Sequence, residues 1–169
     1  MVTGVSHEPT IGFLSSKIIG HIEAHSDHLA DSLWTRVKKC PRLEEFREKV
    51  PHEELRQRAY EIYNHLGEWL QTRSEADVER RYIVIGHRRA GQGVPASQLV
   101  LAIVATKEHL WEHISQEILT EHAIELFQVL ELSRAIETFF DRAIHFAVVG
   151  YEQYAEAHRL DAHAMRENR

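Results

Sequence analysis

The chain has 169 residues, 43% of them hydrophobic, which suits one domain with its own core and excludes a disordered chain. Its formal net charge of −6 excludes the basic surplus of a general nucleic-acid binder, so we expect no nucleic-acid partner. The single cysteine, Cys40, excludes an intramolecular disulfide and a cysteine-only zinc site.

Targeting and membrane signals are not recognisable in the sequence. Residues 1–13 lack a basic stretch followed by a long apolar one, which is the pattern of a signal peptide. Apolar runs also stay well short of the about 20 residues of a membrane span. Together with the sparse use of cysteine, this predicts a cytoplasmic protein that does not contact a membrane.

A first helix is predicted to end near Lys39. Ser6 or Thr10 can cap its beginning, and apolar residues then recur at spacings of three and four. These apolar positions are Ile11, Leu14, Ile18, Ile22, Leu29 and Leu33. Cys40-Pro41 ends the helix, because proline cannot continue it.

Three histidines lie along one side of this first helix. At 100° per residue, His25 falls inside the apolar face, and His21 and His28 lie on its flank. Such a ladder can bind a metal at i, i+4 spacing. The favoured interpretation is a hydrogen-bonded core histidine at position 25 with two surface histidines beside it.

Two shorter helices follow. Residues 42–49 predict a short helix, and Pro51 begins another that ends near Thr72. The apolar positions of the second are Leu55, Ala59, Ile62, Leu66 and Trp69 or Leu70. Ser74, followed by acidic residues, predicts the cap of the next helix.

A firm corner follows that helix, because Gly91, Gly93 and Pro95 lie within five residues. The face before the corner carries Val78, Tyr82, Ile85 and Arg89. A buried arginine needs carboxylates or free carbonyls as partners. Arg89 is therefore either a structural tie, which we favour, or a contact to a ligand, and Tyr82 shares its face.

The most apolar helix is predicted from Pro95 to Leu119. It contains His109 and His113 at i, i+4 spacing, an attractive pattern for a metal. Helical projection places His109 on the polar side and His113 at the edge of the core face. Such a surface pair without a third ligand predicts only a weak site.

Helix propensity continues from Glu121 to about Glu167, but the apolar face rotates by more than 100° along it. Either the helix breaks at residues 131–133, or one long helix contacts different partners at its two ends. The second face, from Leu132 to Tyr151, predicts either core packing or a dimer seam. We expect flexible ends at residues 1–9 and 159–169.

These elements predict an all-α fold, with about six to seven helices in a single domain over residues 1–169. The packing is expected to be a bundle or globin-like. We find no phosphate-binding glycine loop, nucleophile elbow or His-Glu-x-x-His motif. No acid, base and nucleophile set converges, so we expect that the protein is not an enzyme.

Residues 89–95, with Leu99 after them, resemble the Arg-x-x-x-Gly-Val-Pro-x-x-x-Leu signature of RsbRD-type N-terminal domains. These are helical sensory domains of RsbT co-antagonist proteins and of some bacterial histidine kinases. Segments 29–34 and 140–151 agree as well, so the resemblance spans about residues 15–158. It implies a regulatory domain that usually carries an output domain, and one that here acts through a partner protein or as a homodimer.

The same corner is more weakly similar to globin-coupled sensors. In those proteins a proximal histidine lies four residues before a Gly-Leu/Val-Pro sequence, whereas here that position is Arg89. His87 lies two residues earlier and faces about 180° away, so it would ligate haem only from a shifted helix. Thirteen histidines nevertheless favour a metal, haem or pH response.

The sequence thus predicts a non-enzymatic signalling or sensor domain. It would bind a small ligand or a protein partner in or beside a helical core, with Arg89, Tyr82 and His25 as candidate ligand-binding residues. The alternative is a haem- or metal-binding globin-like protein. The candidate metal or haem ligands of this alternative are His25, His87, His109 and His113.

Overall fold

The computed structural model describes residues 13–120 and 126–167, and every regular element in them is helical. The elements are α1 (Phe13–Ala24), α2 (Ser26–Lys39), the 3-10 turn η1 (Pro41–Leu43), α3 (Glu44–Lys49), α4 (His52–Asn64), α5 (Leu66–Gln71), α6 (Glu75–Gly91), α7 (Ala96–Thr120) and α8 (Leu126–Glu167). The all-α prediction is confirmed. Ser6, Thr10 and segment 1–9 lie outside the described residues.

Two of the predicted helices are each divided in two, at His25 and at His65. Both residues leave helical geometry with nearly the same backbone angles, φ −110° and ψ 16° at His25 and φ −119° and ψ 27° at His65. The two breaks are joined, because Ser26 donates a hydrogen bond to Asn64 (3.3 Å) and the amide of Gly67 donates one to a carboxylate on α1 (2.8 Å). The two helix breaks therefore have similar backbone geometry and lie next to each other.

The predicted corner is confirmed. Ser74 begins α6 with a capping box, in which its side chain and that of Asp77 each bond the other residue's amide. Gly93 has a φ of 72°, the left-handed region that glycine enters at no steric cost. Tyr151 on α8 donates a hydrogen bond to the carbonyl of Val94 (2.8 Å), so the corner is held by the last helix.

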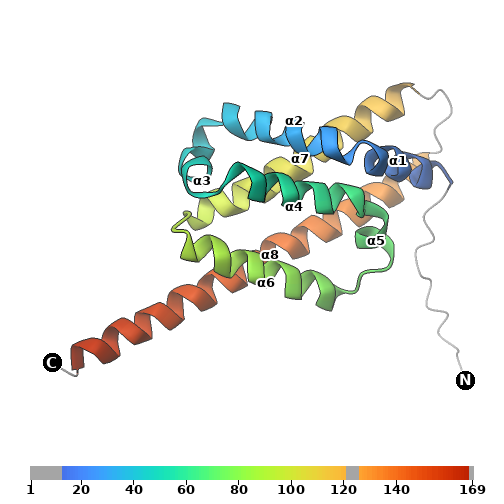
Figure 1. The fold of residues 1–169 in the computed structure, drawn as a ribbon. Helices are drawn as coiled ribbons and strands as arrows, with labels where there is room; N and C mark the ends of the chain where they lie inside the picture. Colours follow the sequence, from blue (N-terminus) through green and yellow to red (C-terminus); the bar gives the residue numbers. More distant parts are fainter. Residues whose placement is uncertain (1–12, 121–125, 168–169) are drawn as a thin grey trace, which may run out of the picture.

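Of the two alternatives for the C-terminal region, one continuous helix is correct, because α8 passes through residues 131–133 without a break. Figure 1 shows its final turns projecting beyond the rest of the bundle, and the described side chains of residues 155–165 are exposed. The apolar side chains of its second face are buried in the core of this chain: Leu132, Ile136, Phe139, Phe140, Ala143 and Ala147. That face packs the core, and the prediction that it forms a dimer seam is wrong.

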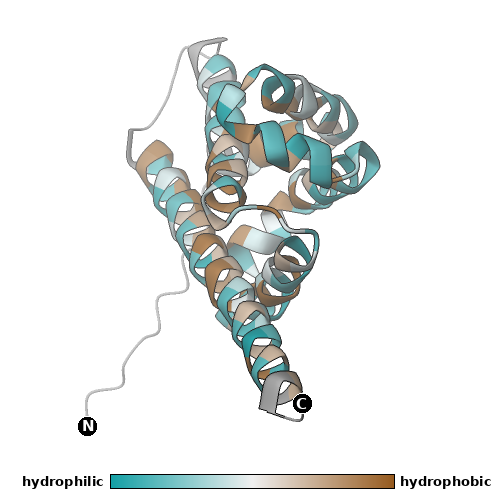
Figure 2. Cartoon of the chain, turned by 90° about the vertical axis from the view of Figure 1, so that its left-hand side faces the viewer, coloured by the Kyte–Doolittle hydropathy of each residue, from teal (hydrophilic) through white to brown (hydrophobic). Residues whose placement is uncertain are grey.

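The core gathers buried side chains from all the helices that surround α7 and α8. Helix α8 packs most extensively on α6, and α2 on α4. Figure 2 shows hydrophobic and hydrophilic residues alternating along α8, as expected of a helix with one buried face. This arrangement leaves α4 and α6 facing each other, with ion pairs between them.

Candidate functional site

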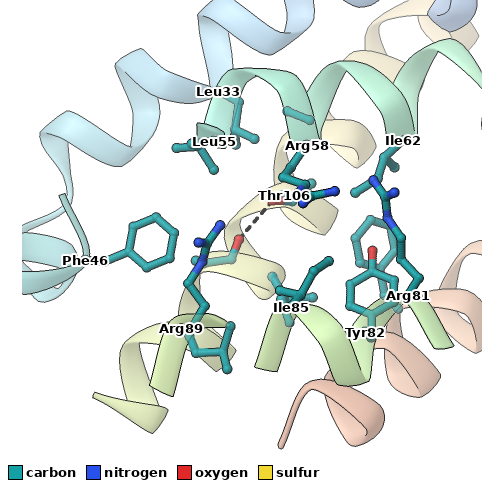
Figure 3. A pocket seen from close by; sticks show the side chains of 15 residues that line it. Leu33, Phe46, Leu55, Arg58, Ile62, Arg81, Tyr82, Ile85, Arg89 and Thr106 are labelled. Carbon is teal, nitrogen blue, oxygen red and sulfur yellow. Dashed lines mark hydrogen bonds between the residues drawn. The ribbon is translucent and has the colours of Figure 1, made fainter. Parts of the chain in front are cut away.

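A cavity lies between α4 and α6. The volume within it that is open to the centres of water-sized molecules is about 60 Å³. Its apolar walls come from six helices and consist of Leu33, Phe46, Leu55, Ala59, Ile62, Ile85, Leu99, Ala102, Ile103 and Phe140. Polar groups come from Arg58, Arg81, Tyr82, Arg89 and Thr106, and Figure 3 shows the arginines reaching from α4 and α6 into the space between the helices.

Arg89 is 3% exposed and forms an ion pair with Glu54 on α4. The same guanidinium donates to Gln92 (2.8 Å) and lies 5.7 Å from the centre of the Phe46 ring. Burial lowers the pKa of Arg89, although the Glu54 carboxylate favours its charged form. Burial opposes ionisation of Glu54 as well, but hydrogen bonds from Arg88 and Arg89 keep its pKa below the ordinary value. The group joins α4, α6 and the corner.

A second charged group stands farther along the cavity. Arg81 on α6 forms an ion pair with Glu61 on α4, and Arg58 approaches the same carboxylate oxygen at 3.5 Å. Burial opposes the charge on Glu61, but the hydrogen bonds from Arg81 and Gln57 and the charges of Arg81 and Arg58 together outweigh it, so the pKa of Glu61 is lowered. The side chains of Arg58, Arg81 and Glu61 are each about one third exposed or less, so this group lies at the mouth of the cavity.

Tyr82 lies between these two groups on α6. It is 3% exposed, and its ring meets Phe139 edge-on at 6.0 Å between centroids. Its hydroxyl points from α6 toward α4 in Figure 3, and no hydrogen bond joins it to the other cavity residues drawn there. Burial raises its pKa well above the ordinary value of a tyrosine, so the hydroxyl stays protonated and can donate a hydrogen bond.

The candidate ligand His25 lies away from this cavity. Sequence periodicity predicts it inside the core, but the structure places it exposed at the break between α1 and α2. Its Nδ1 lies 2.8 Å from the carbonyl oxygen of His21, and the two rings stack at 4.2 Å. The break turns the helix by enough to move position 25 from the apolar face to the surface.

His109 is buried, although projection predicts it on the polar side of its helix. It is 4% exposed, with Nε2 2.6 Å from the hydroxyl of Ser32 on α2 and Nδ1 2.9 Å from the hydroxyl of Tyr63 on α4. Helices α2 and α4 cover the side of α7 that the helical projection identifies as polar. The imidazole thus connects three helices.

The buried state of His109 makes folding sensitive to pH. Burial, followed by the charges of His113 and Arg36, lowers its pKa from 6.5 to about 4. Between these values the unfolded chain binds a proton that the folded chain does not, so the free energy of unfolding falls as the pH drops from 6.5 to 4. We expect a loss of about 2–3 kcal/mol from this residue.

Urea unfolding at pH 7 and pH 4.5 measures this loss, and His109→Gln supplies the comparison. The difference in unfolding free energy between the two pH values should be smaller in the variant by most of the amount given above. An equal pH dependence in both proteins would contradict the buried neutral state of His109.

The remaining candidate ligands are not brought together. His87 points to α8, with Nε2 3.3 Å from the side-chain oxygen of Gln153, and His113 is half-buried with its ring 4.8 Å from that of His109. Among the described residues, no group of three or more histidine, cysteine or acidic side chains is arranged to hold a metal ion. Haem does not fit the cavity either, because the cavity volume of about 60 Å³ is far too small for it. The ion pair of Arg89 with Glu54 also occupies the end of the cavity beside the turn between α6 and α7.

Sequence reasoning selects Tyr82 and Arg89 but not their partners. Nothing in the sequence marks Glu54, Glu61 or Arg58 as partners of these residues. No periodic signal connects residues 20 to 35 positions apart on different helices. The cavity is therefore visible only once α4 and α6 are placed opposite each other.

None of the helices in the described part of the chain is both long enough and apolar enough to cross a membrane. Comparison with protein families matches residues 23–166 to the RsbT co-antagonist protein rsbRD N-terminal domain. No curated protein and no solved structure matches the chain. The weaker similarity to globin-coupled sensors stays a prediction. Since the family match includes the cavity, the corner and nearly all of α8, the chain belongs to the RsbRD N-terminal domain family.

Proposed function

We propose that the chain is a non-enzymatic sensor domain that changes its contact with a protein partner when a small ligand enters the cavity between α4 and α6. The family is named for a co-antagonist of RsbT, which supports a role in signalling between proteins. The observation that carries the proposal is the course of α8. This one helix lines the cavity with Phe140, packs closely on α6, and then continues as an exposed helix.

Helix α6 connects the cavity to α8. One of its faces carries the cavity residues Tyr82 and Arg89, and another packs on α8 through Gly86. A Cβ atom built on Gly86 would lie 2.0 Å from the carbonyl oxygen of Ala147, and one built on Gly150 would lie 2.2 Å from that of Ile83. Since backbone meets backbone at these crossings, no flexible side chain can absorb a displacement of α6. A ligand that moves α6 therefore moves α8.

The partner proposed is a second copy of this chain, bound along the exposed end of α8. Among the described residues the large hydrophobic side chains with high exposure are Val84, Leu130, Leu160 and Met165. Leu160 and Met165, at 66% and 75% exposure, both lie on this end of α8. Five residues apart, the two side chains project about 140° from each other, so a second helix that packs between them would cover part of each.

Light scattering after size-exclusion chromatography tests the proposed dimer. The wild-type chain should elute as a dimer at micromolar concentration, and the double variant Leu160→Glu/Met165→Glu as a monomer. The thermal midpoint of the monomer itself should not fall, because both side chains project from the surface. Val84→Glu, which adds one negative charge at an exposed position on α6, is the control and should stay dimeric.

A wild-type chain that is monomeric at every concentration would contradict the proposed partner. So would a double variant that dimerises as well as the Val84→Glu control. Either result would place the output of the domain on a surface other than the end of α8.

A further inference from the structure

We propose that the ligand of the α4–α6 cavity is a short-chain monocarboxylate, with its alkyl tail inside the cavity and its carboxylate between Tyr82 and Arg58. This inference rests on the proposed sensor function and specifies its ligand. It is carried by three separate features of the cavity: an unpaired hydroxyl, an excess of positive charge, and apolar walls around a small volume.

The unpaired hydroxyl belongs to Tyr82. A buried hydroxyl without a partner costs stability, so most buried polar groups are hydrogen-bonded. No buried side-chain polar atom of the described residues lacks a partner, so the Tyr82 hydroxyl, which Figure 3 shows facing the cavity without a hydrogen bond to the other residues drawn, is open to the space inside it although the residue as a whole is 3% exposed. A group held there as a protonated donor is matched by a ligand that brings an acceptor oxygen.

Four arginines share two carboxylates at this site, and three of them, Arg58, Arg81 and Arg89, line the cavity. Arg88 and Arg89 both pair with Glu54, and Arg58 and Arg81 both approach Glu61. Arg58 is the least engaged of the four, because its contact with Glu61 is 3.5 Å long and it makes no hydrogen bond to the described residues. The cavity mouth thus favours an anion, and the planar guanidinium suits a carboxylate.

The volume and the walls define the rest of the ligand. A buried water needs about 10–15 Å³ of such space, so 60 Å³ accommodates about four to six non-hydrogen atoms. The inner walls are leucine, isoleucine, alanine and phenylalanine side chains, together with the Thr106 hydroxyl, which already donates to the Ala102 carbonyl (2.9 Å). A second charged group on the ligand would lose its hydration inside the cavity and find no partner there. An alkyl tail of a few carbons fills the space and leaves one carboxylate at the mouth.

Isothermal titration calorimetry of the full chain with butanoate tests the proposal. Saturable binding of one butanoate per chain is expected. Acetate, which lacks two CH₂ groups, should bind about tenfold more weakly, at roughly 0.8 kcal/mol for each. Butanamide has the same shape without the charge and inorganic phosphate has charge without the tail, and both should bind at least tenfold more weakly than butanoate.

Tyr82→Phe tests the position of the carboxylate. The variant keeps the ring and should weaken butanoate binding about tenfold or more, since it removes a hydrogen bond to a charged group. Its thermal midpoint should stay the same or rise, so lost binding cannot be ascribed to lost folding. Arg58→Gln should weaken binding to a similar degree. Arg80→Gln is the matched control, because Arg80 is 73% exposed on the same helix as Tyr82, and it should bind like wild type.

Equal binding of butanoate and butanamide, or of butanoate and phosphate, would overturn the proposal. Undiminished binding to both Tyr82→Phe and Arg58→Gln would also overturn it, as would the lack of any butanoate binding. These results are distinguishable from failure of the proposed function. Butanoate binding together with a monomeric wild-type chain would refute the proposed partner and leave the ligand assignment standing.

Discussion

Gly86→Ala should destabilise the protein by about 3 kcal/mol, close to the upper end of what overpacking costs. A Cβ atom at this position would lie 2.0 Å from the carbonyl oxygen of Ala147 and 2.8 Å from the amide nitrogen of Tyr151. Both atoms belong to the backbone of α8, so the clash is relieved only when the two helices separate. Chemical denaturation followed by far-ultraviolet circular dichroism measures the change.

Gly20→Ala is the matched control for this substitution. Gly20 also lies within a helix, α1, but a Cβ atom built there meets nothing within 4 Å. Alanine should stabilise the helix at this position by about 0.5–1 kcal/mol, because glycine loses more backbone freedom on folding. If both variants changed stability by the same small amount, α6 and α8 would not be in backbone contact and the proposed route from cavity to α8 would fail.

Glu54→Gln should cost about 3 kcal/mol or more, the usual penalty for leaving one partner of a buried ion pair alone. The substitution preserves size but removes the negative charge beside the guanidinium of Arg89, which is nearly inaccessible to water. Glu53→Gln is the control, because Glu53 is the exposed neighbour on the same turn of α4 and should change stability by less than about 0.5 kcal/mol. Urea unfolding at pH 7 compares the three proteins.

The Glu54 contribution also depends on pH. Its pKa is lower in the folded chain, so the stabilisation is present above the unfolded pKa of about 4.3 and is lost as the pH falls through the folded value. The gap between wild type and Glu54→Gln should therefore shrink below about pH 4. A gap that is small at pH 7, or constant down to pH 3, would show that Arg89 does not depend on this carboxylate.

Local chemistry in the sequence predicts the corner and the cap of α6 well. Glycine at a positive φ, proline at a helix start and serine before acidic residues each act within a few residues. The breaks at His25 and His65 escape prediction for the opposite reason. The apolar spacing continues across both positions, and the hydrogen bonds that join the two breaks connect residues 38 and 44 positions apart in the chain.

The candidate site is predictable only in part, because periodicity along one helix is visible in the sequence and contacts between helices are not. Tyr82 and Arg89 share a helical face, so periodicity identifies them together, whereas their partners on α4 are set by tertiary packing. His109 shows the limit of projection, which assumes one buried face for each helix. Helix α7 has neighbours on more than one side, so a histidine on its apparently polar side is enclosed by α2 and α4.

The central claim is that the α4–α6 cavity and the exposed end of α8 form one coupled system. Two coupled binding events must affect each other's free energy by the same amount. Sedimentation equilibrium therefore provides the most direct test, with the dimer dissociation constant measured with and without saturating butanoate, in wild type and in Tyr82→Phe at the same butanoate concentration. We predict a shift of about fivefold or more in wild type and little or none in the variant. An unchanged dissociation constant in wild-type protein that demonstrably holds butanoate would contradict the account.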